Sequence, residues 1–200
     1  VAAVAALDLN TAYEAAALIK VDYEELPPVM TLDDAMKANA ALLHDDLFTD
    51  ELGEKSKVAS NVAGHFRFEM GDVEKGFAEA DVVVEREFDT ASVHQGYIEP
   101  HSCTALWNMD GRLHIWGCTQ GSFGVRDSVG EVLRTPVSEI KVIPTEIGGG
   151  FGGKIPIYLE PIAATLSKKS GLPVKVTMSR AEVFESSGPA PGSWMKVKIG

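Results

Sequence analysis

The sequence predicts an α+β fold, a mixture of short strands and capped helices spread over 200 residues. Stretches of alternating apolar and polar residues, typical of half-buried strands, lie between stretches with helical spacing. Turn and cap residues separate these stretches, and Asp110-Gly111 between two apolar runs is a strong hairpin signal. The hydrophobic content of 45% and the charged content of 24% are ordinary for a globular protein.

The first 40 residues contain four predicted elements: strands at 1–6 and 21–25, and helices at 10–19 and 31–40. Asn10 or Thr11 is expected to cap the first helix, with Glu14 at capping-box distance from Thr11. Thr31 is expected to cap the second helix. Residues 41–64 carry five acids and no steady periodicity, so they are predicted to be a surface linker.

The remainder of the chain is richer in regular patterns. Strands are predicted at 65–69, 82–90, 104–108, 113–116, 140–144, 174–177 and 196–200. Helices are predicted from the Asp72 cap to Ala80, at 122–133 and at 157–169, where Gly171 ends the helix. Ser179 is expected to cap a further short helix, with Glu182 at capping-box distance.

Charge is unevenly distributed along the chain. Residues 1–100 hold 21 acids against seven Lys and Arg, a net −14, whereas residues 101–200 hold eight acids against 11 Lys and Arg, a net +3. The acidic half and the lack of a basic stripe argue against nucleic-acid binding. No apolar run approaches the 18 residues of a membrane span, so none is expected.

The only cysteines, Cys103 and Cys118, lie on neighbouring apolar runs. Two such residues are typical of buried thiols in a reduced compartment, so a cytoplasmic location is expected. No cysteine spacing suits an iron–sulfur cluster. Because the sequence starts at Val1 and stops inside a predicted strand, we expect an internal piece of a longer chain.

The most informative segment is Gly148-Gly149-Gly150-Phe151-Gly152-Gly153-Lys154. Glycines let the backbone approach a ligand closely and adopt positive φ. A predicted strand precedes this segment and a predicted helix follows it, so free N–H groups at a helix N-terminus would suit a phosphate. Lys154 is either a point charge for a pyrophosphate or a solvated side chain.

Two other interpretations of this segment remain open. From Gly148 it nearly fits the P-loop pattern, but Ile155 replaces the Ser or Thr that would bind Mg²⁺. A packed glycine turn without a ligand is the other. His94, His101 and His114 could suggest zinc, although their spacing fits no helical ligand pair. Glu99 and Glu160 are possible acid–base groups, Glu160 more simply a helix-surface or packing carboxylate.

Four motifs together resemble the molybdenum-binding large subunit of the xanthine dehydrogenase/aldehyde oxidase family. They occur in the family's order and are spread from about residue 20 to residue 155: Val21–Pro28, Gln95–Pro100, Cys118-Thr119-Gln120-Gly121 and Ile147–Lys154. The resemblance covers essentially the whole chain. The resemblance implies the end of an α/β hammerhead domain at 1–40, a linker at 41–64, and the first part of a molybdopterin-binding domain at 65–200.

The resemblance also implies a cofactor and its contacts. The cofactor is molybdopterin with molybdenum, expected in its cytosine dinucleotide form. The residues expected to contact it are Gln120, Gly149, Gly150, Phe151, Gly152 and Gly153. Gln120 would donate to an oxygen on the metal without ligating it, and no residue here would ligate the metal directly.

The activity implied is oxidation of an aldehyde, aromatic or N-heterocyclic C–H substrate, with water as the oxygen source. Purine-oxidising members carry a glutamate where this chain has Ile155, which disfavours purines. The catalytic base would lie beyond Gly200, so no catalytic residue is expected here and the piece alone would be inactive. [2Fe-2S] clusters and FAD are expected on other domains or subunits of a dimeric assembly. The alternative is a non-catalytic binding or assembly module of the same fold.

Overall fold

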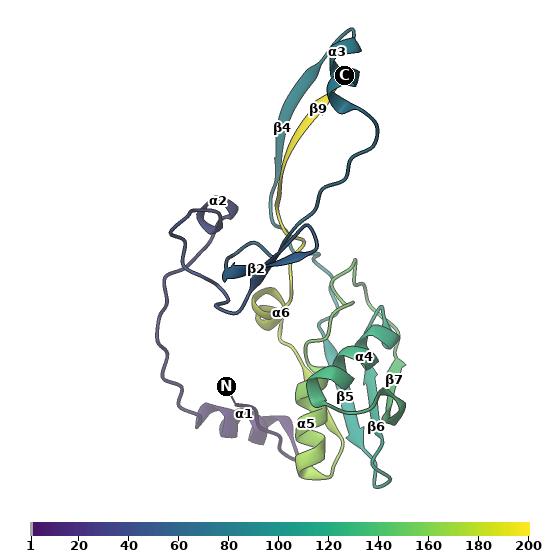
Figure 1. Cartoon of the computed structure of the whole chain (residues 1–200). Helices are drawn as coiled ribbons and strands as arrows, with labels where there is room; N and C mark the ends of the chain where they lie inside the picture. Colours follow the sequence, from purple (N-terminus) through teal and green to yellow (C-terminus); the bar gives the residue numbers. More distant parts are fainter. Residues whose placement is uncertain (1) are drawn as a thin grey trace. The chain divides into compact units, whose positions relative to one another are not determined.

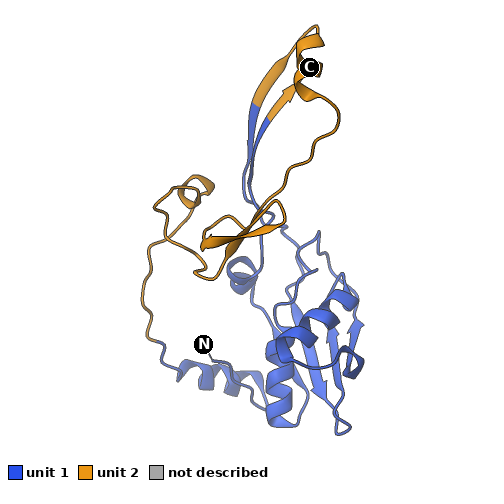
Figure 2. Cartoon of the chain, in the orientation of Figure 1, with its two compact units in different colours: residues 1–21, 87–196 blue, residues 22–86, 197–200 orange. Residues whose placement is uncertain are grey.

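A computed structural model describes residues 2–200 of the chain. The chain divides into two compact units, which Figure 2 distinguishes by colour. Unit 1 comprises residues 1–21 and 87–196, and unit 2 comprises residues 22–86 and 197–200. No helix among residues 2–200 is long and apolar enough to cross a membrane.

A four-stranded mixed sheet organises unit 1 (Figure 1). Its strands, in spatial order, are β7 (Ile140–Pro144), β6 (Leu113–Gly117), β5 (Ser102–Trp107) and β8 (Val174–Thr177). β5 pairs antiparallel with both β6 and β8, whereas β6 and β7 run parallel. The predicted hairpin through Asp110-Gly111 is confirmed as β5–β6, and the predictions of β7 and β8 are confirmed with the same bounds.

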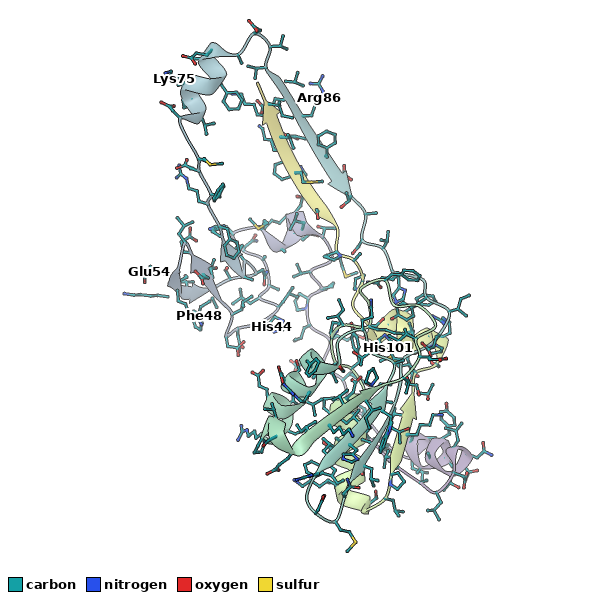
Figure 3. All side chains as sticks on the ribbon, turned by 90° about the vertical axis from the view of Figure 1, so that its right-hand side faces the viewer. His44, Phe48, Glu54, Lys75, Arg86 and His101 are labelled. Carbon is teal, nitrogen blue, oxygen red and sulfur yellow. The ribbon has the colours of Figure 1, made fainter. Side chains whose placement is uncertain are left out.

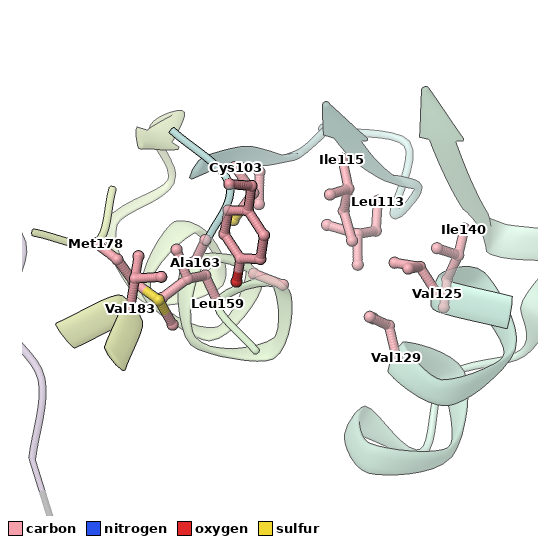
Figure 4. Packing of buried hydrophobic residues seen from close by; sticks show 13 residues of the cluster. Cys103, Leu113, Ile115, Val125, Val129, Ile140, Leu159, Ala163, Met178 and Val183 are labelled. Atoms are coloured by element: carbon pink, nitrogen blue, oxygen red, sulfur yellow. The ribbon is translucent and has the colours of Figure 1, made fainter. Parts of the chain in front are cut away.

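Two helices supply the partner layer for this sheet. α4 (Ser122–Leu133) packs on β7, and α5 (Glu160–Ser170) packs on β5 and β8. Figure 4 shows the core between these helices and the strands. Leu113 and Ile115 of β6 are fully buried and Val125 and Val129 of α4 are nearly so, because every second strand residue and every fourth helix residue faces inward.

Local cap signals set the helix ends of unit 1. Gly171 ends α5 with φ 69°, the left-handed conformation that glycine favours, as predicted. The predicted capping box of Ser179 and Glu182 opens α6 (Arg180–Ser186) and is present in full. α4 has the predicted bounds, and a short 3₁₀ helix (η1, Val137–Glu139) leads from it into β7.

The predicted start of α5 is wrong. The helix begins at Glu160, not at residue 157, with Pro161 in its first turn. Tyr158 N–H donates to the Glu160 carboxylate at 2.9 Å, a contact that closes a bend before the helix. Five residues, 155–159, therefore separate Lys154 from α5. The N–H groups of the glycine segment are not those of a helix N-terminus.

The N-terminal predictions are only partly correct. α1 spans Leu9–Ala17 and is capped by Asp8, whose carboxylate accepts from Thr11 N–H at 3.0 Å. Asp8 takes the capping role predicted for Asn10 or Thr11. Residues 2–6 and 21–25 form no strand, and Val1 lies outside the described residues. A strand needs a pairing partner for its backbone groups, and residues 2–200 provide none for these two segments.

Unit 2 contains a small sheet that the sequence interpretation missed. β1 (Phe48–Glu51) pairs antiparallel with β2 (Glu54–Ala59) and parallel with β3 (Gly64–His65). The prediction of an irregular linker at 41–64 is therefore wrong in its local structure. Leu52-Gly53, both at positive φ, turn the hairpin. The strand predicted at 65–69 is reduced to β3.

The helices of unit 2 are short. α2 (Leu32–Ala35) has the predicted Thr31 cap but ends five residues before the expected residue 40. α3 (Val73–Glu79) has the predicted Asp72 cap, whose carboxylate accepts from Lys75 N–H at 2.9 Å. A four-residue helix offers little apolar surface, and α2 buries none of its residues.

A two-stranded ribbon is formed by β4 (Val84–Thr90) and β9 (Ser193–Ile199). Both strands were predicted, β4 from residue 82 and β9 from residue 196. No residue of either strand is buried. Figure 3 shows the side chains of this ribbon, with Arg86 labelled among them, standing away from the backbone.

Candidate functional site

The candidate site lies where β6 and β7 end. These strands are parallel, and Gly117 at the end of β6 is paired with Pro144 at the end of β7. Thr119 and Gln120 follow β6, and residues 147–154, the glycine loop, follow β7. Because the carboxyl ends of neighbouring parallel strands share one sheet edge, two motifs far apart in sequence meet.

Gln120 holds the glycine loop through its side chain and its backbone. Its Oε1 accepts from Gly152 N–H at 3.1 Å and from Lys154 N–H at 3.2 Å. Its own N–H donates to the Lys154 carbonyl at 3.0 Å, which also accepts from the Thr119 hydroxyl at 3.2 Å. The structure therefore brings together Gln120 and the loop residues that the sequence singled out.

These contacts also orient the Gln120 amide group. Two N–H donors fix the oxygen toward the loop, so the NH₂ group faces the other way. Within residues 2–200 this NH₂ group donates no hydrogen bond, and the residue is exposed. Gln120 thus offers an unused neutral donor beside the glycine loop.

Gly148, Gly150 and Gly153 allow tight internal packing. A Cβ atom placed at Gly150 would lie 2.5 Å from Gln120 Oε1, and one at Gly153 would lie 2.7 Å from Tyr97 Cε1. One at Gly148 would lie 2.7 Å from Glu99 Cβ. Real Cβ atoms do not approach other atoms so closely, so these three positions need glycine for the loop to seat.

Gly149 and Gly152 serve a different need, since both have positive φ, 95° and 89°. A Cβ placed at Gly152 would meet no atom within 4 Å, so that backbone faces open space. Phe151 between them also has positive φ, 50°, and its side chain is 74% exposed. A bulky residue in the left-handed conformation has a cost in backbone strain. Such strain is typical of positions where the residue serves a binding contact.

The tip of the glycine loop carries unpaired backbone donors. Gly153 N–H is taken by the Gly150 carbonyl at 2.8 Å, and Gly148 and Gly152 N–H are taken by side chains. The N–H groups of Gly149, Gly150 and Phe151 make no hydrogen bond to any residue from 2 to 200. Gly150 is buried and Gly149 half-buried, whereas Phe151 is exposed. Successive free N–H groups at a turn suit anionic oxygen atoms.

Lys154 neither reaches solvent nor extends toward a ligand. Its side chain is fully buried, and its Nζ lies 2.7 Å from Glu99 Oε2 and 4.9 Å from the centre of the Tyr97 ring. Both interpretations of Lys154 from the sequence, as a solvated side chain or as a free charge for a pyrophosphate, are therefore wrong. Nothing in the sequence around Lys154 predicts that its side chain is buried.

A hydrogen-bonded chain of polar side chains continues beyond Tyr97. The Tyr97 hydroxyl lies 2.7 Å from His101 Nε2 and 3.2 Å from Ser187 Oγ, which in turn lies 3.1 Å from His94 Nε2. Burial, with the nearby charge of Lys154, lowers the pKa of His101 to about 4, so the imidazole is neutral at pH 7. His101 is labelled in Figure 3.

The described residues hold no cluster of three or more His, Cys, Asp or Glu side chains that could bind a metal. His94 and His101 are linked through hydroxyl groups, while His114 lies on β6 against Trp116. Glu160 is buried, which excludes a helix-surface role, and its carboxylate accepts from Tyr158 N–H.

The two cysteines are free and buried, as predicted. Burial raises the pKa of the Cys103 thiol, so it stays protonated and unreactive. One further acceptor has no partner. Gln95 Oε1 is buried without a hydrogen bond among the residues described here, and it lies 3.1 Å from a Cβ placed at Gly153.

Comparisons with known proteins identify relatives of this chain. The chain is 34% identical to a protein of Escherichia coli O157:H7 named "Probable hypoxanthine oxidase", over its whole length and 23% of that protein. It is 35% identical to the xanthine dehydrogenase molybdenum-binding subunit of the same organism, over 92% of this chain and 23% of that one. The chain thus spans about a quarter of the length of these relatives.

A solved structure, CO dehydrogenase from Oligotropha carboxidovorans, matches with a TM-score of 0.77 at 32% identity. The match covers 96% of this chain and 24% of that one. The family model of the molybdopterin cofactor-binding domain matches residues 54–200. The chain therefore belongs to the molybdopterin cofactor-binding domain family, and its resemblance to the molybdopterin-binding large subunit of the xanthine dehydrogenase family is confirmed.

Proposed function

We propose that this chain supplies one wall of the cofactor site in a molybdopterin-dependent oxidoreductase. The proposal depends on two sets of unused hydrogen-bond donors that lie near each other. They are the free N–H groups of Gly149, Gly150 and Phe151 and the NH₂ group of Gln120. Both sets of donors lie at one sheet edge, because Gln120 is hydrogen-bonded to the loop that carries the amides.

The residues present fit a large anionic cofactor. The backbone at Gly152 faces open space and can be approached closely, which side chains would prevent. The free amides suit the oxygen atoms of a pterin phosphate, and a neutral amide such as Gln120 can donate to an oxygen on the metal without replacing a ligand. Phe151 would lie against one side of the cofactor, and Gly153 brings the loop close to Tyr97.

A P-loop nucleotide site fits less well. Its metal-binding hydroxyl is replaced by Ile155, α5 starts only at Glu160, and Lys154 is engaged with Glu99. Each of the three parts that would hold a nucleotide triphosphate and Mg²⁺ is therefore missing or occupied. The glycine loop shares only its composition with a P-loop.

The cofactor, when bound, would supply the two-electron oxidation of a C–H bond with water as the oxygen source. The protein's part is to bind the cofactor and orient it. Ile155 follows Lys154 directly and is 56% exposed, and it can offer only apolar contact. We infer a substrate that needs no hydrogen bond from the side chain at position 155. An aldehyde, an aromatic compound or an N-heterocycle other than a purine would fit.

The rest of the enzyme follows from the same proposal. We place [2Fe-2S] clusters and FAD on other domains or subunits of a dimeric assembly, as the motif resemblance implies. We assign the catalytic base to a part of the protein outside this sequence. The cytosine dinucleotide form of the cofactor, and residues 1–40 as the end of a hammerhead domain, remain parts of the proposal that rest on motif resemblance.

A matched pair of glycine variants tests the cofactor site. Gly152 and Gly111 both have positive φ, 89° and 84°, and open space where a Cβ would be. Alanine at either position therefore costs a similar ~1 kcal/mol of backbone strain. In the full-length protein, Gly152→Ala should lower the molybdenum and pterin content about tenfold, because its Cβ would stand between backbone and cofactor. Gly111→Ala should leave both unchanged.

A second variant tests the NH₂ group of Gln120 while it keeps an oxygen for the glycine loop. Gln120→Glu keeps an oxygen that accepts from the glycine loop but replaces the NH₂ donor with a negative charge. We expect normal folding by circular dichroism and a loss of activity per bound molybdenum. Equal cofactor content and activity in Gln120→Glu, Gly152→Ala and the wild type would refute the proposal and favour a non-catalytic module.

A further inference from the structure

A single carboxylate oxygen joins the two ends of the glycine loop. Glu99 Oε2 accepts from Gly148 N–H at 2.7 Å and from Lys154 Nζ at 2.7 Å. Gly148 is the first glycine of the loop and Lys154 is its last residue. The span between them contains every free N–H group that the proposed function uses.

The contact to Lys154 is costly to break. The Lys154 side chain is fully buried, whereas the Glu99 side chain is 35% exposed. Removing the carboxylate would leave an ammonium group with no opposite charge in a dry environment, beside the Tyr97 ring. Burial raises the pKa of Glu99, but hydrogen bonds from Lys154 and Gly148 outweigh it and hold the pKa below its usual value.

Glu99 is itself firmly placed. Arg180, at the start of α6, donates to the main-chain carbonyls of Tyr97 and Ile98, immediately before Glu99. Glu99 Cβ also fills the space beside Gly148 that a side chain there would need. The carboxylate is thus anchored from the body of unit 1, not from the loop that it holds.

Two acceptors therefore hold the loop from two sides. Gln120 Oε1 holds Gly152 and Lys154, and Glu99 Oε2 holds Gly148 and Lys154. We propose that Glu99 is a positioning residue, which closes the base of the glycine loop through Lys154 and Gly148 and so aims the loop's free amides at an anionic cofactor. This inference rests on the proposed function for its cofactor, but not for the clamp itself.

Three variants of the full-length protein test the clamp. Glu99→Gln keeps an acceptor for Gly148 but leaves Lys154 unpaired. Lys154→Met removes the charge and keeps most of the side-chain volume. The double variant Glu99→Gln/Lys154→Met removes both charges together. Glu79→Gln is the control, because Glu79 forms an exposed ion pair with Lys75 at 3.8 Å, which contributes little.

The first measurement is hydrogen–deuterium exchange of a peptide covering residues 147–154 in cofactor-free protein. Glu99→Gln should speed exchange there by roughly tenfold or more, because a broken buried pair loosens the segment that it held. The double variant should regain the wild-type melting temperature, because no buried charge is left unpaired. It should keep faster exchange, because the side chain at position 154 no longer holds the end of the loop. Glu79→Gln should match the wild type.

The second measurement is molybdenum and pterin content, with kcat and KM per loaded enzyme. Positioning predicts lower content and lower kcat at unchanged KM, in both Glu99→Gln and the double variant. A merely structural ion pair predicts that the double variant restores exchange and content together, which would overturn the inference. If Glu99→Gln fails to fold, the double variant decides between these outcomes.

The two measurements separate the clamp from the cofactor. Unchanged loop exchange in Glu99→Gln and in the double variant would refute the clamp, whatever the cofactor content. Faster exchange with full cofactor content would support the clamp and refute the proposed role of the loop in binding.

Discussion

The β5–β6 hairpin and the β4–β9 ribbon are both antiparallel pairs of short strands, yet they differ completely in burial. β6 buries three of its five residues, in strict alternation, whereas neither β4 nor β9 buries any of its seven. Pairing is present in both, so pairing alone does not create a core. The difference is that α5 covers the hairpin, while α4 covers the neighbouring strand β7 and completes the same core.

This difference explains where the candidate site can be precise. The donors of the glycine loop and Gln120 stand on strand ends whose register is set by buried residues, so their positions are fixed within this chain. The apolar side chains of the ribbon, such as Phe88 and Trp194, are more than half exposed. A site built on that ribbon would lack such support.

Matched isoleucines should show the largest effect. Ile115 of β6 is fully buried and Ile199 of β9 is 66% exposed. In the 200-residue chain, Ile115→Ala should cost about 2–5 kcal/mol of unfolding free energy, because it leaves a cavity between sheet and helix. Ile199→Ala should stay within about 0.5 kcal/mol. Urea unfolding measures both variants, and equal losses of unfolding free energy would show that burial does not distinguish the hairpin from the ribbon.

Matched serines should give a smaller difference. Ser167 is fully buried, its Oγ accepting from Trp107 N–H at 3.1 Å and donating to the Leu172 carbonyl at 2.8 Å. Ser167→Ala leaves Trp107 N–H without this partner and leaves the Leu172 carbonyl only the hydrogen bond from Ser170 Oγ at 3.4 Å, so it should cost about 1–3 kcal/mol. Ser193 on β9 is exposed, so Ser193→Ala should be nearly neutral. Thermal unfolding measures both variants, and an equal fall in their melting temperatures would contradict the prediction.

A pH dependence from His101 is the third expected effect. Its pKa falls from 6.5 to about 4 on folding, because of burial and of the charges of Lys154 and His94, against the opposing charge of Glu99. The unfolded chain therefore takes up a proton first on acidification. Stability should decline as the pH falls from 6.5 toward 4.

His101→Asn removes this titration and keeps a polar group beside Tyr97. Its unfolding free energy should change less with pH over that interval than the wild type does. Parallel slopes for the two proteins, measured by urea unfolding at several pH values, would show that another group carries the dependence.

Sequence patterns were most reliable where a local signal fixes a local outcome. The Asp110-Gly111 turn, the left-handed cap at Gly171 and the capping box at Ser179 each depend on a few neighbouring residues. The same holds for α4, which has its predicted bounds. The meeting of Gln120 with the glycine loop was available only through motif resemblance, because it depends on strand order.

The predictions failed where long-range pairing decides the structure. Residues 41–64 have no clear periodicity, yet β1 gains partners on both sides and becomes a strand. Residues 21–25 have a clear strand pattern but no partner, and they form none. Lys154 looked like a surface residue because no sequence pattern reveals a carboxylate 55 positions away that neutralises it.

The parallel pairing of β6 with β7 determines which changes in chain length the molecule can absorb. The connection between them runs through α4 and η1, and residues added at its surface turns would leave the strand ends side by side. One residue inserted between Leu113 and Ile115 would instead shift the ladder, so that only one of these two side chains could still face the core. Natural insertions in homologous chains should therefore concentrate between these strands and avoid their interiors.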